Sequence, residues 1–241
     1  MSTPRRLSRK GVNKPAMSQG SETPPPGADW ADTAEQQVLD HALALAPQEG
    51  WNARLALKAG RAAGFSAGET ELLIPHGARD LAALMSRRHD AGALTRLAEV
   101  DPAALKIRER IAAGLAARLD AAAQDEAAVR RWMGFLALPP NVALAGKLAW
   151  ESADVLWRWA GDTATDENHY SKRVLLAGIL TGALAIRLSS GRGEALAFVD
   201  RRIADVMSFE KWKATTPLRP AAALAQLAAG LGRLRYGRPP A

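Results

Sequence analysis

The stretch WMGFLALPPNVALAGKLAWESADVLWRWAGD (residues 132–162) decides the fold class of this chain. Apolar residues recur at helical spacing on both sides of Pro139-Pro140, which stops a first helix, and Gly161-Asp162 closes a second. The stretch holds four of the seven tryptophans, and large aromatic side chains bury much surface and dominate interfaces. Two interpretations follow: a helical core alone, or an apolar pocket whose rim docks a partner.

Amphipathic segments separated by helix breakers continue on both sides of this stretch. Alanine and leucine dominate the composition, which favours helix, and no segment alternates convincingly with a period of two. No uninterrupted apolar run approaches the ~18 residues of a membrane-spanning helix. The sequence therefore predicts an all-α fold. We expect helices over residues 33–49, 54–63, 66–74, 76–88, 91–100, 105–124, 126–138, 142–160, 166–189 and 194–207.

The net charge of +7 is concentrated at the two ends of the chain. Residues 1–20 carry five basic residues and no acidic one, and the tail after Pro217 carries four basic residues and no acidic one. The rest of the chain is slightly acidic, so only the ends are suited to phosphate, whether of lipid head groups or of nucleic acid. Cysteine is absent, which excludes disulfides, thiolate nucleophiles and cysteine-bound zinc or iron–sulfur sites.

Composition and breakers divide the chain into four segments. Residues 1–29 are polar, basic and proline-rich at their end, and predict a disordered arm without the apolar core of a secretory signal. Residues 30–76 predict a helix-turn-helix unit, and residues 77–214 a helical ligand-binding domain. Residues 215–241 read as a proline linker and a terminal amphipathic helix.

The helix-turn-helix unit resembles the N-terminal domain of TetR-type regulators in the run VLDHALAL, EGW and AAGFS between residues 38 and 66. Ser66 and Glu69 have the spacing of a capping box that opens the second short helix. The candidate recognition helix over 66–74 carries Glu69 and Glu71 but neither lysine nor arginine. Because operator binding depends on cations that neutralise phosphates, we expect a TetR-like fold without DNA binding. A TetR-type ligand-responsive repressor is the alternative.

The terminal segment has an apolar stripe of leucines followed by arginines and no acids, which suits an anionic membrane surface. Packing of the same helix on the body, or against a second copy, is the competing interpretation. The residues predicted to bind the membrane are Leu224, Leu227, Leu231, Leu234, Arg233 and Arg235.

No catalytic motif emerges. The four histidines, His41, His76, His89 and His169, have no HxxxH or ExxH spacing, and GxSxG, P-loop and GxGxxG motifs are absent. We expect these histidines at the surface or at helix ends, and Asp154, Asp162 and Asp166 as caps or solvated residues. In the helix over 105–124, arginines 108, 110 and 118 fall between the apolar positions. The sequence therefore predicts a protein that is not an enzyme, with no metal and no cofactor.

Three motifs together resemble the Coq-nine family of ubiquinone biosynthesis proteins. They are LPPNV at 138–142, DVLWRWAGD at 154–162 and TDENHYSKRVLLA at 165–177. The resemblance covers roughly residues 34–236. The chain departs from the family pattern at His169, where tryptophan is common, and at Pro140, where histidine is common, and both departures bear on a partner contact.

The resemblance implies a homodimeric, TetR-like accessory protein that binds isoprenoid quinone intermediates and presents them to the di-iron hydroxylase of demethoxy-ubiquinone. It implies a place at the cytoplasmic face of a bacterial inner membrane or in the cytoplasm, or on the matrix side of the mitochondrial inner membrane in a eukaryote. The residues suited to line a lipid pocket are Trp132, Phe135, Leu136, Trp150, Leu156, Leu175 and Ile179. The residues suited to contact the hydroxylase are Asp154, Leu156, Trp157, Asp166, His169, Tyr170 and Arg173.

Overall fold

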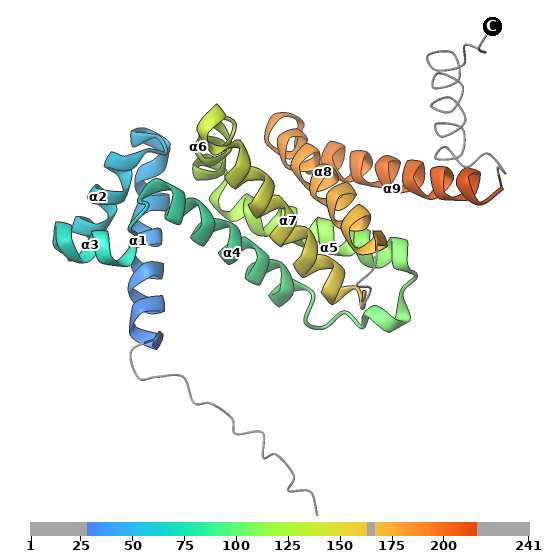
Figure 1. The fold of residues 1–241 in the computed structure, drawn as a ribbon, viewed down its shortest axis with the longest axis horizontal. Helices are drawn as coiled ribbons and strands as arrows, with labels where there is room; N and C mark the ends of the chain where they lie inside the picture. Colours follow the sequence, from blue (N-terminus) through green and yellow to red (C-terminus); the bar gives the residue numbers. More distant parts are fainter. Residues whose placement is uncertain (1–27, 163–166, 216–241) are drawn as a thin grey trace, which may run out of the picture.

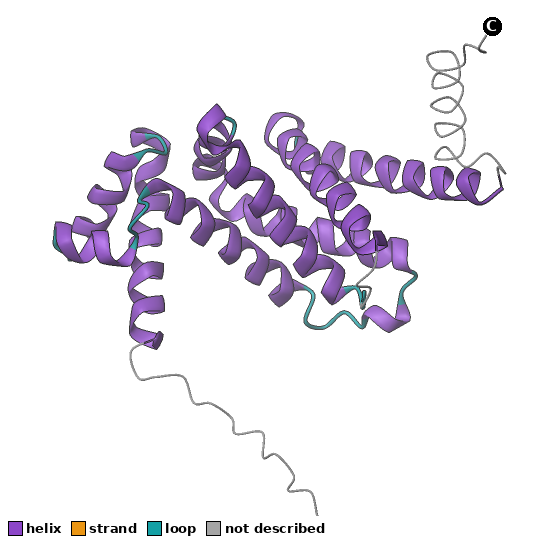
Figure 2. Ribbon diagram, viewed as in Figure 1, coloured by secondary structure: helices purple, strands orange, loops and turns teal. Residues whose placement is uncertain are grey.

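A computed structural model describes residues 28–162 and 167–215 of the chain. Helices are the regular elements of these ranges, which confirms the all-α prediction (Figure 2). The predicted terminal helix, with its leucines and arginines between 224 and 235, and the basic arm up to residue 27 lie outside the described residues. The α-helices are α1 (Ala28–Glu49), α2 (Ala53–Ala62), α3 (Ala67–Leu73), α4 (Ala78–Arg96), α5 (Ile107–Ala122), α6 (Glu126–Leu136), α7 (Val142–Trp159), α8 (Glu167–Ser190) and α9 (Arg192–Thr215).

Helices α1, α2 and α3 form a small unit at one end of the molecule (Figure 1). Gly64 ends α2 in the left-handed region, at φ 89°, which costs glycine little. The predicted capping box is present: the Glu69 backbone N–H donates to Ser66 Oγ at 3.2 Å, and the Ser66 N–H donates to Glu69 Oε2 at 2.8 Å. The order and lengths of these helices are consistent with a TetR-like helix-turn-helix.

A glycine sets the crossing of α2 over α3. A Cβ built on Gly60 would lie 2.1 Å from Oγ1 of Thr70, a buried residue of α3. We predict that Gly60→Ala lowers the free energy of unfolding by about 1–3 kcal/mol, because the overpacking outweighs the gain in helix propensity. Thermal unfolding measures this. The double variant Gly60→Ala/Thr70→Ala removes the two closest contacts, with Oγ1 and Cγ2, but keeps the Cβ at 2.9 Å, so it should recover part of the loss. A Gly60→Ala protein as stable as the parent would contradict the packing argument.

Helix α4 joins this unit to the body of the protein (Figure 1). The sequence predicted two helices here, over 76–88 and 91–100, and this was wrong: α4 is continuous from Ala78 to Arg96. The intervening His89 and Asp90 are helix-compatible residues whose side chains are held inside the protein by buried partners. A polar pair inside an apolar pattern was misread as a break in the helix.

Helices α4 to α9 pack around a core that is continuous with the buried faces of α1 and α2. Within it α4 lies against α5 and α7, and α8 lies between α7 and α9. The indole N–H of Trp132 donates to the Ala82 carbonyl at 3.2 Å, so α6 is tied to α4 without an unpaired polar atom. The far part of α9 extends beyond the bundle (Figure 1). By length and composition alone, the stretch His169–Ser190 of α8 is apolar enough to cross a membrane, and it is the one such helix among the described residues.

Candidate functional site

Arg173 organises the junction where α7 ends and α8 begins. Its side chain is almost fully buried, although arginine is seldom found inside a protein without partners. Nε donates to Asp154 Oδ1 at 2.6 Å, and Nη1 donates to Asp162 Oδ2 and to the His169 carbonyl, both at 3.1 Å. One guanidinium therefore ties together the last turns of α7, Asp162 three residues beyond its end, and the first turns of α8.

Asp162 is the most enclosed carboxylate of this junction. Lys172 Nζ also donates to it, to Oδ1 at 2.8 Å. Burial by itself would raise the pKa of Asp162, but the hydrogen bonds from Lys172 and Arg173 outweigh it and hold the pKa below its usual value. The carboxylate is therefore charged at neutral pH. The sequence predicted Asp154 and Asp162 as caps or solvated residues, and the structure corrects this, because both are partners of a buried arginine.

Three aromatic rings from α7 and α8 gather beside this junction. The ring centroids of Trp150 and Tyr170 are 5.9 Å apart, those of Trp150 and His169 are 6.3 Å apart, and those of His169 and Tyr170 are 5.2 Å apart. We call these three residues the aromatic cluster. Tyr170 is 63% exposed, and Val174, one turn further along α8, is 60% exposed. The cluster therefore presents an apolar, aromatic surface of the kind that anchors protein interfaces.

The predicted partner-binding residues divide into surface and interior. His169 and Tyr170 belong to the aromatic cluster. Trp157 is partly buried against the core, and its indole N–H donates to the Lys172 carbonyl at 3.1 Å. Leu156 and Arg173 are buried, and this corrects the expectation that they reach a partner. They stabilise the junction from inside, because an apolar α7 face and a paired guanidinium are both packed inward. Asp166 lies outside the described residues.

A first cavity, of about 300 Å³, opens among α4 to α8. We call it the inner cavity. Its walls are mostly aliphatic and aromatic, while Ser86, Arg118 and Ser152 contribute polar groups. Ligand pockets typically combine an apolar wall with a few polar groups in this way. Its lining residues are Ser86, Arg118, Trp132, Met133, Leu136, Ala137, Val142, Ala145, Leu148, Ala149, Ser152, Leu180, Thr181 and Leu184.

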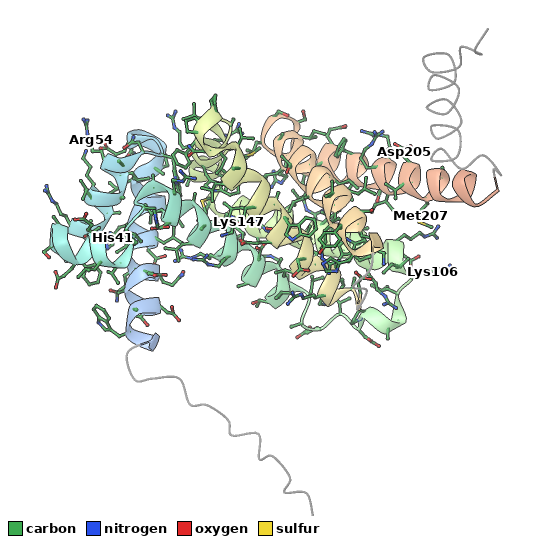
Figure 3. The ribbon with its side chains drawn as sticks, in the orientation of Figure 1. His41, Arg54, Lys106, Lys147, Asp205 and Met207 are labelled. Carbon is green, nitrogen blue, oxygen red and sulfur yellow. The ribbon has the colours of Figure 1, made fainter. Side chains whose placement is uncertain are left out.

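A second cavity, of about 540 Å³, lies between α5, the junction and α9. We call it the α5–α9 groove. Figure 3 labels Met207 on α9 and Lys106 just before α5, the two helices between which it opens. Ile107, Leu175 and Met207 are exposed apolar residues on its walls, and Lys172 and Arg108 add positive charge. An apolar groove with a cationic edge suits an amphiphile.

The predicted lipid-binding residues do not share one pocket. Trp132 and Leu136 line the inner cavity, and Leu175 and Ile179 line the α5–α9 groove. Trp150 belongs to the aromatic cluster, Phe135 packs partly buried against the core, and Leu156 is a fully buried core residue. The helical spacing of apolar residues identified the apolar faces of the helices correctly. It does not tell between which of these faces a cavity remains.

A buried polar network at the inner cavity was missed by sequence reasoning. Arg118 Nε donates to Asp90 Oδ1 at 2.6 Å, and Ser152 Oγ donates to Asp90 Oδ2 at 3.0 Å. The neighbouring His89 is buried, contrary to the surface position expected for the histidines, and its Nε2 lies 2.9 Å from Asp125 Oδ2. The pKa of His89 lies below its usual value, mainly because the ring is buried and also because Arg118 is positively charged. The hydrogen bond to Asp125 opposes this shift but is outweighed.

A signal for this network was present in the sequence. Arg118 follows the buried Ile111 by seven residues, so both lie on one face of α5. An arginine at such a position reaches inward and needs a buried carboxylate. Among the described residues, no three histidine, aspartate or glutamate side chains gather in a way that could hold a metal ion.

The helices that carry this site coincide with a known family domain. Residues 142–210, which span α7, α8 and most of α9, match the family model described as COQ9. The chain is 26% identical over 198 residues to "Ubiquinone biosynthesis protein COQ9-A, mitochondrial" of Xenopus laevis, covering 76% of this chain and 60% of the relative. It is 25% identical over 185 residues to the COQ9 protein of Rattus norvegicus, covering 72% and 59%.

The human COQ9 protein is 21% identical over 224 residues, which is 83% of this chain and 68% of the relative. The chain thus spans about 60% of the length of the first curated relatives that it matches. Two of the three motifs that carry the resemblance noted in the sequence, at 154–162 and 165–177, supply the junction residues together with His169 and Tyr170 of the aromatic cluster. The COQ9 match in α7 to α9 and these relatives show that the chain is similar to the COQ9 family of ubiquinone biosynthesis proteins.

Proposed function

We propose that this protein serves ubiquinone biosynthesis as a non-catalytic accessory that binds an isoprenoid quinone intermediate and presents it to the di-iron hydroxylase. The observation that carries the proposal is the coincidence of the COQ9 match with the helices of the junction: residues 142–210 contain the aromatic cluster and Arg173, and supply residues to both cavities. Relatives that match the chain are named ubiquinone biosynthesis proteins.

The two cavities support the lipid-binding part of the proposal. A polyprenyl-substituted ring needs an apolar enclosure, and the walls of the inner cavity supply one next to buried hydrogen-bonding groups. The α5–α9 groove offers exposed leucine, isoleucine and methionine along which a chain can lie. The four predicted lipid-binding residues that line these cavities, Trp132, Leu136, Leu175 and Ile179, are the ones we retain for this role.

The aromatic cluster supports the partner-binding part. Tyr170 and Val174 are exposed, while the buried Arg173 ion pairs hold the helix beneath them in place. A rigid platform with an exposed aromatic anchor loses little conformational entropy when a partner docks. We therefore assign hydroxylase docking to Trp150, His169 and Tyr170, with Trp157 at the edge, and a positioning role to Arg173, Asp154 and Leu156.

We also propose that the protein is a homodimer and that residues 215–241 attach it peripherally to the membrane. It would then lie at the membrane in which the quinone substrate is found. The helix-turn-helix unit is not proposed to bind DNA, because α3 carries Glu69 and Glu71 beside an exposed Leu72 and has no basic residue. An acidic and apolar helix disfavours a phosphate backbone.

Quinone analysis of cells that lack this protein tests the proposal. We predict a fall in ubiquinone and an accumulation of the precursor on which the hydroxylase acts, because an accessory that delivers the substrate limits that one step. The full-length chain supplied in trans should restore ubiquinone. Normal ubiquinone in the deleted cells, or accumulation of a precursor from a different step, would contradict the assignment.

A further inference from the structure

The inner cavity has a polar end and an open end. Ser86, Arg118 and Ser152 line it and are buried, whereas Thr181 and Val142 line it and are exposed, Val142 by 56%. The buried polar groups therefore lie deep in the protein, and the exposed residues form the mouth. A molecule with one polar group and an apolar body would enter with the polar group first.

Arg118, which lines this polar end, has a hydrogen-bond donor to spare. Its Nε is paired with Asp90, but its Nη1 is buried and has no hydrogen-bond partner in the described part of the chain. A buried donor without an acceptor is costly, and one on a charged group is more costly still. An acceptor oxygen brought by a ligand would remove that cost, so the cavity favours a ligand that carries one.

The charge of the network says which kind of acceptor fits. The positive charge of Arg118 is already balanced by Asp90, 2.6 Å away, and Asp90 also accepts from Ser152. The nearby His89 is paired with the carboxylate of Asp125. A ligand carboxylate or phosphate would therefore bring an unbalanced negative charge into a site with little water, which is costly. An uncharged oxygen adds a hydrogen bond and no net charge.

We propose that the inner cavity receives the uncharged head group of a lipid whose carbonyl accepts a hydrogen bond from Arg118, with the chain leaving past Val142 and Thr181. The class of ligand is a quinone, ketone or ester of a lipid, not a fatty acid or a phospholipid head group. A cavity of about 300 Å³ holds a substituted ring but not a polyprenyl chain, given that a ring the size of benzene fits a cavity of roughly 150 Å³. The inference rests on the proposed function, because it takes the ligand to be a lipid.

Three probes of equal size separate the head group from the apolar body: nonanone, decane and octanoate, titrated calorimetrically into the full chain. Because decane leaves water more readily than nonanone, the affinities of these two probes are first corrected for their free energies of transfer from water to alkane. On that scale we expect nonanone to bind about tenfold more tightly than decane, and in uncorrected affinity we expect octanoate to bind more weakly than nonanone by a similar factor. Corrected affinities that are equal for decane and nonanone would overturn the head-group inference and leave the apolar cavity standing. Octanoate as the tightest ligand would overturn the charge argument, and no binding by any probe would overturn the apolar pocket of the proposed function as well.

Arg118→Lys tests the residue itself. Lysine keeps the positive charge beside Asp90 but lacks the forked donors, so the preference for nonanone over decane should fall to less than about twofold while decane binding stays. An unchanged preference in the variant would remove Arg118 from the site. Ala149→Trp, which fills the cavity from α7 without touching the ion pair, should abolish binding of all three probes. The probe series on the parent protein decides the inference even if the Arg118 variant does not fold.

Discussion

Arg173→Ala is expected to lower the free energy of unfolding by about 3 kcal/mol, the lower end of the range for breaking a buried ion pair. The substitution leaves Asp154 and Asp162 without their shared guanidinium inside the junction. The loss stays near the lower end because Lys172 still contacts Asp162 and Arg158 still contacts Asp154, at 2.8 Å in each case. Urea unfolding followed by circular dichroism measures it.

Arg158→Ala is the matched control, because Arg158 contacts the same Asp154 but its side chain is 73% exposed. It should cost no more than about 0.5 kcal/mol, as exposed ion pairs do. Equal effects of the two substitutions would contradict the view that burial of Arg173 holds the junction.

The effect of Arg173→Ala should also depend on pH in a defined direction. The pKa of Asp162 is depressed in the folded protein, so its contribution to stability is present above the pKa of the unfolded chain, about 3.8, and is lost as the pH falls through the lower folded value. Replacing Arg173 removes much of that depression. The gap in stability between parent and variant should therefore narrow as the pH falls below about 4.

Tyr170→Ala is expected to weaken binding of the di-iron hydroxylase by about 2 kcal/mol, roughly 30-fold in Kd, as truncation of a central aromatic anchor does. Tyr170 is the most exposed member of the aromatic cluster, and its ring lies 5.9 Å from that of Trp150 and 5.2 Å from that of His169. Removing the ring takes away the anchor and loosens its neighbours, while the core of α8 is untouched. Surface plasmon resonance with the purified hydroxylase measures the change.

Two controls accompany the Tyr170 variant. Tyr170→Phe keeps the ring and should bind within about threefold of the parent, if the ring supplies most of the contact. Leu72→Ala alters an apolar residue that is 85% exposed on α3, far along the chain from the cluster, and should leave binding unchanged. Equal losses for Tyr170→Ala and Leu72→Ala would indicate a partner surface elsewhere.

Local signals in the sequence were sufficient for the helices. The spacing of apolar residues, the Pro139-Pro140 break and the Ser66–Glu69 capping box each act within a few residues, and the structure has a helix or a helix end at each of them. The exception is α4, where His89 and Asp90 interrupt the apolar pattern because their partners, Asp125 and Arg118, come from later in the chain. Nothing near His89 and Asp90 in the sequence reveals these partners, and the one signal of the pairing lies on α5, where Arg118 falls on a buried helical face.

The candidate site could be predicted only in part, because local motifs identify its residues but not which of them face solvent. The motifs around residues 154–177 brought the right residues to one junction, but the sequence does not tell which side of a helix faces solvent where two helices meet at an angle. Tyr170 is exposed and Arg173, three residues later, is buried. Cavities are harder still to predict from sequence, because each depends on the side chains of several helices at once. The predicted lipid-binding residues are accordingly divided between two cavities and the core.

The central claim is that this protein carries a lipid, and mass spectrometry of the organic extract from gently purified protein tests it most directly. The account predicts an isoprenoid quinone or a related neutral lipid in near-stoichiometric amount from the parent protein, and a marked loss from Ala149→Trp, whose side chain fills the inner cavity. A parent protein that is consistently empty, and that instead shifts duplex DNA at physiological salt, would contradict the account and favour a ligand-responsive repressor.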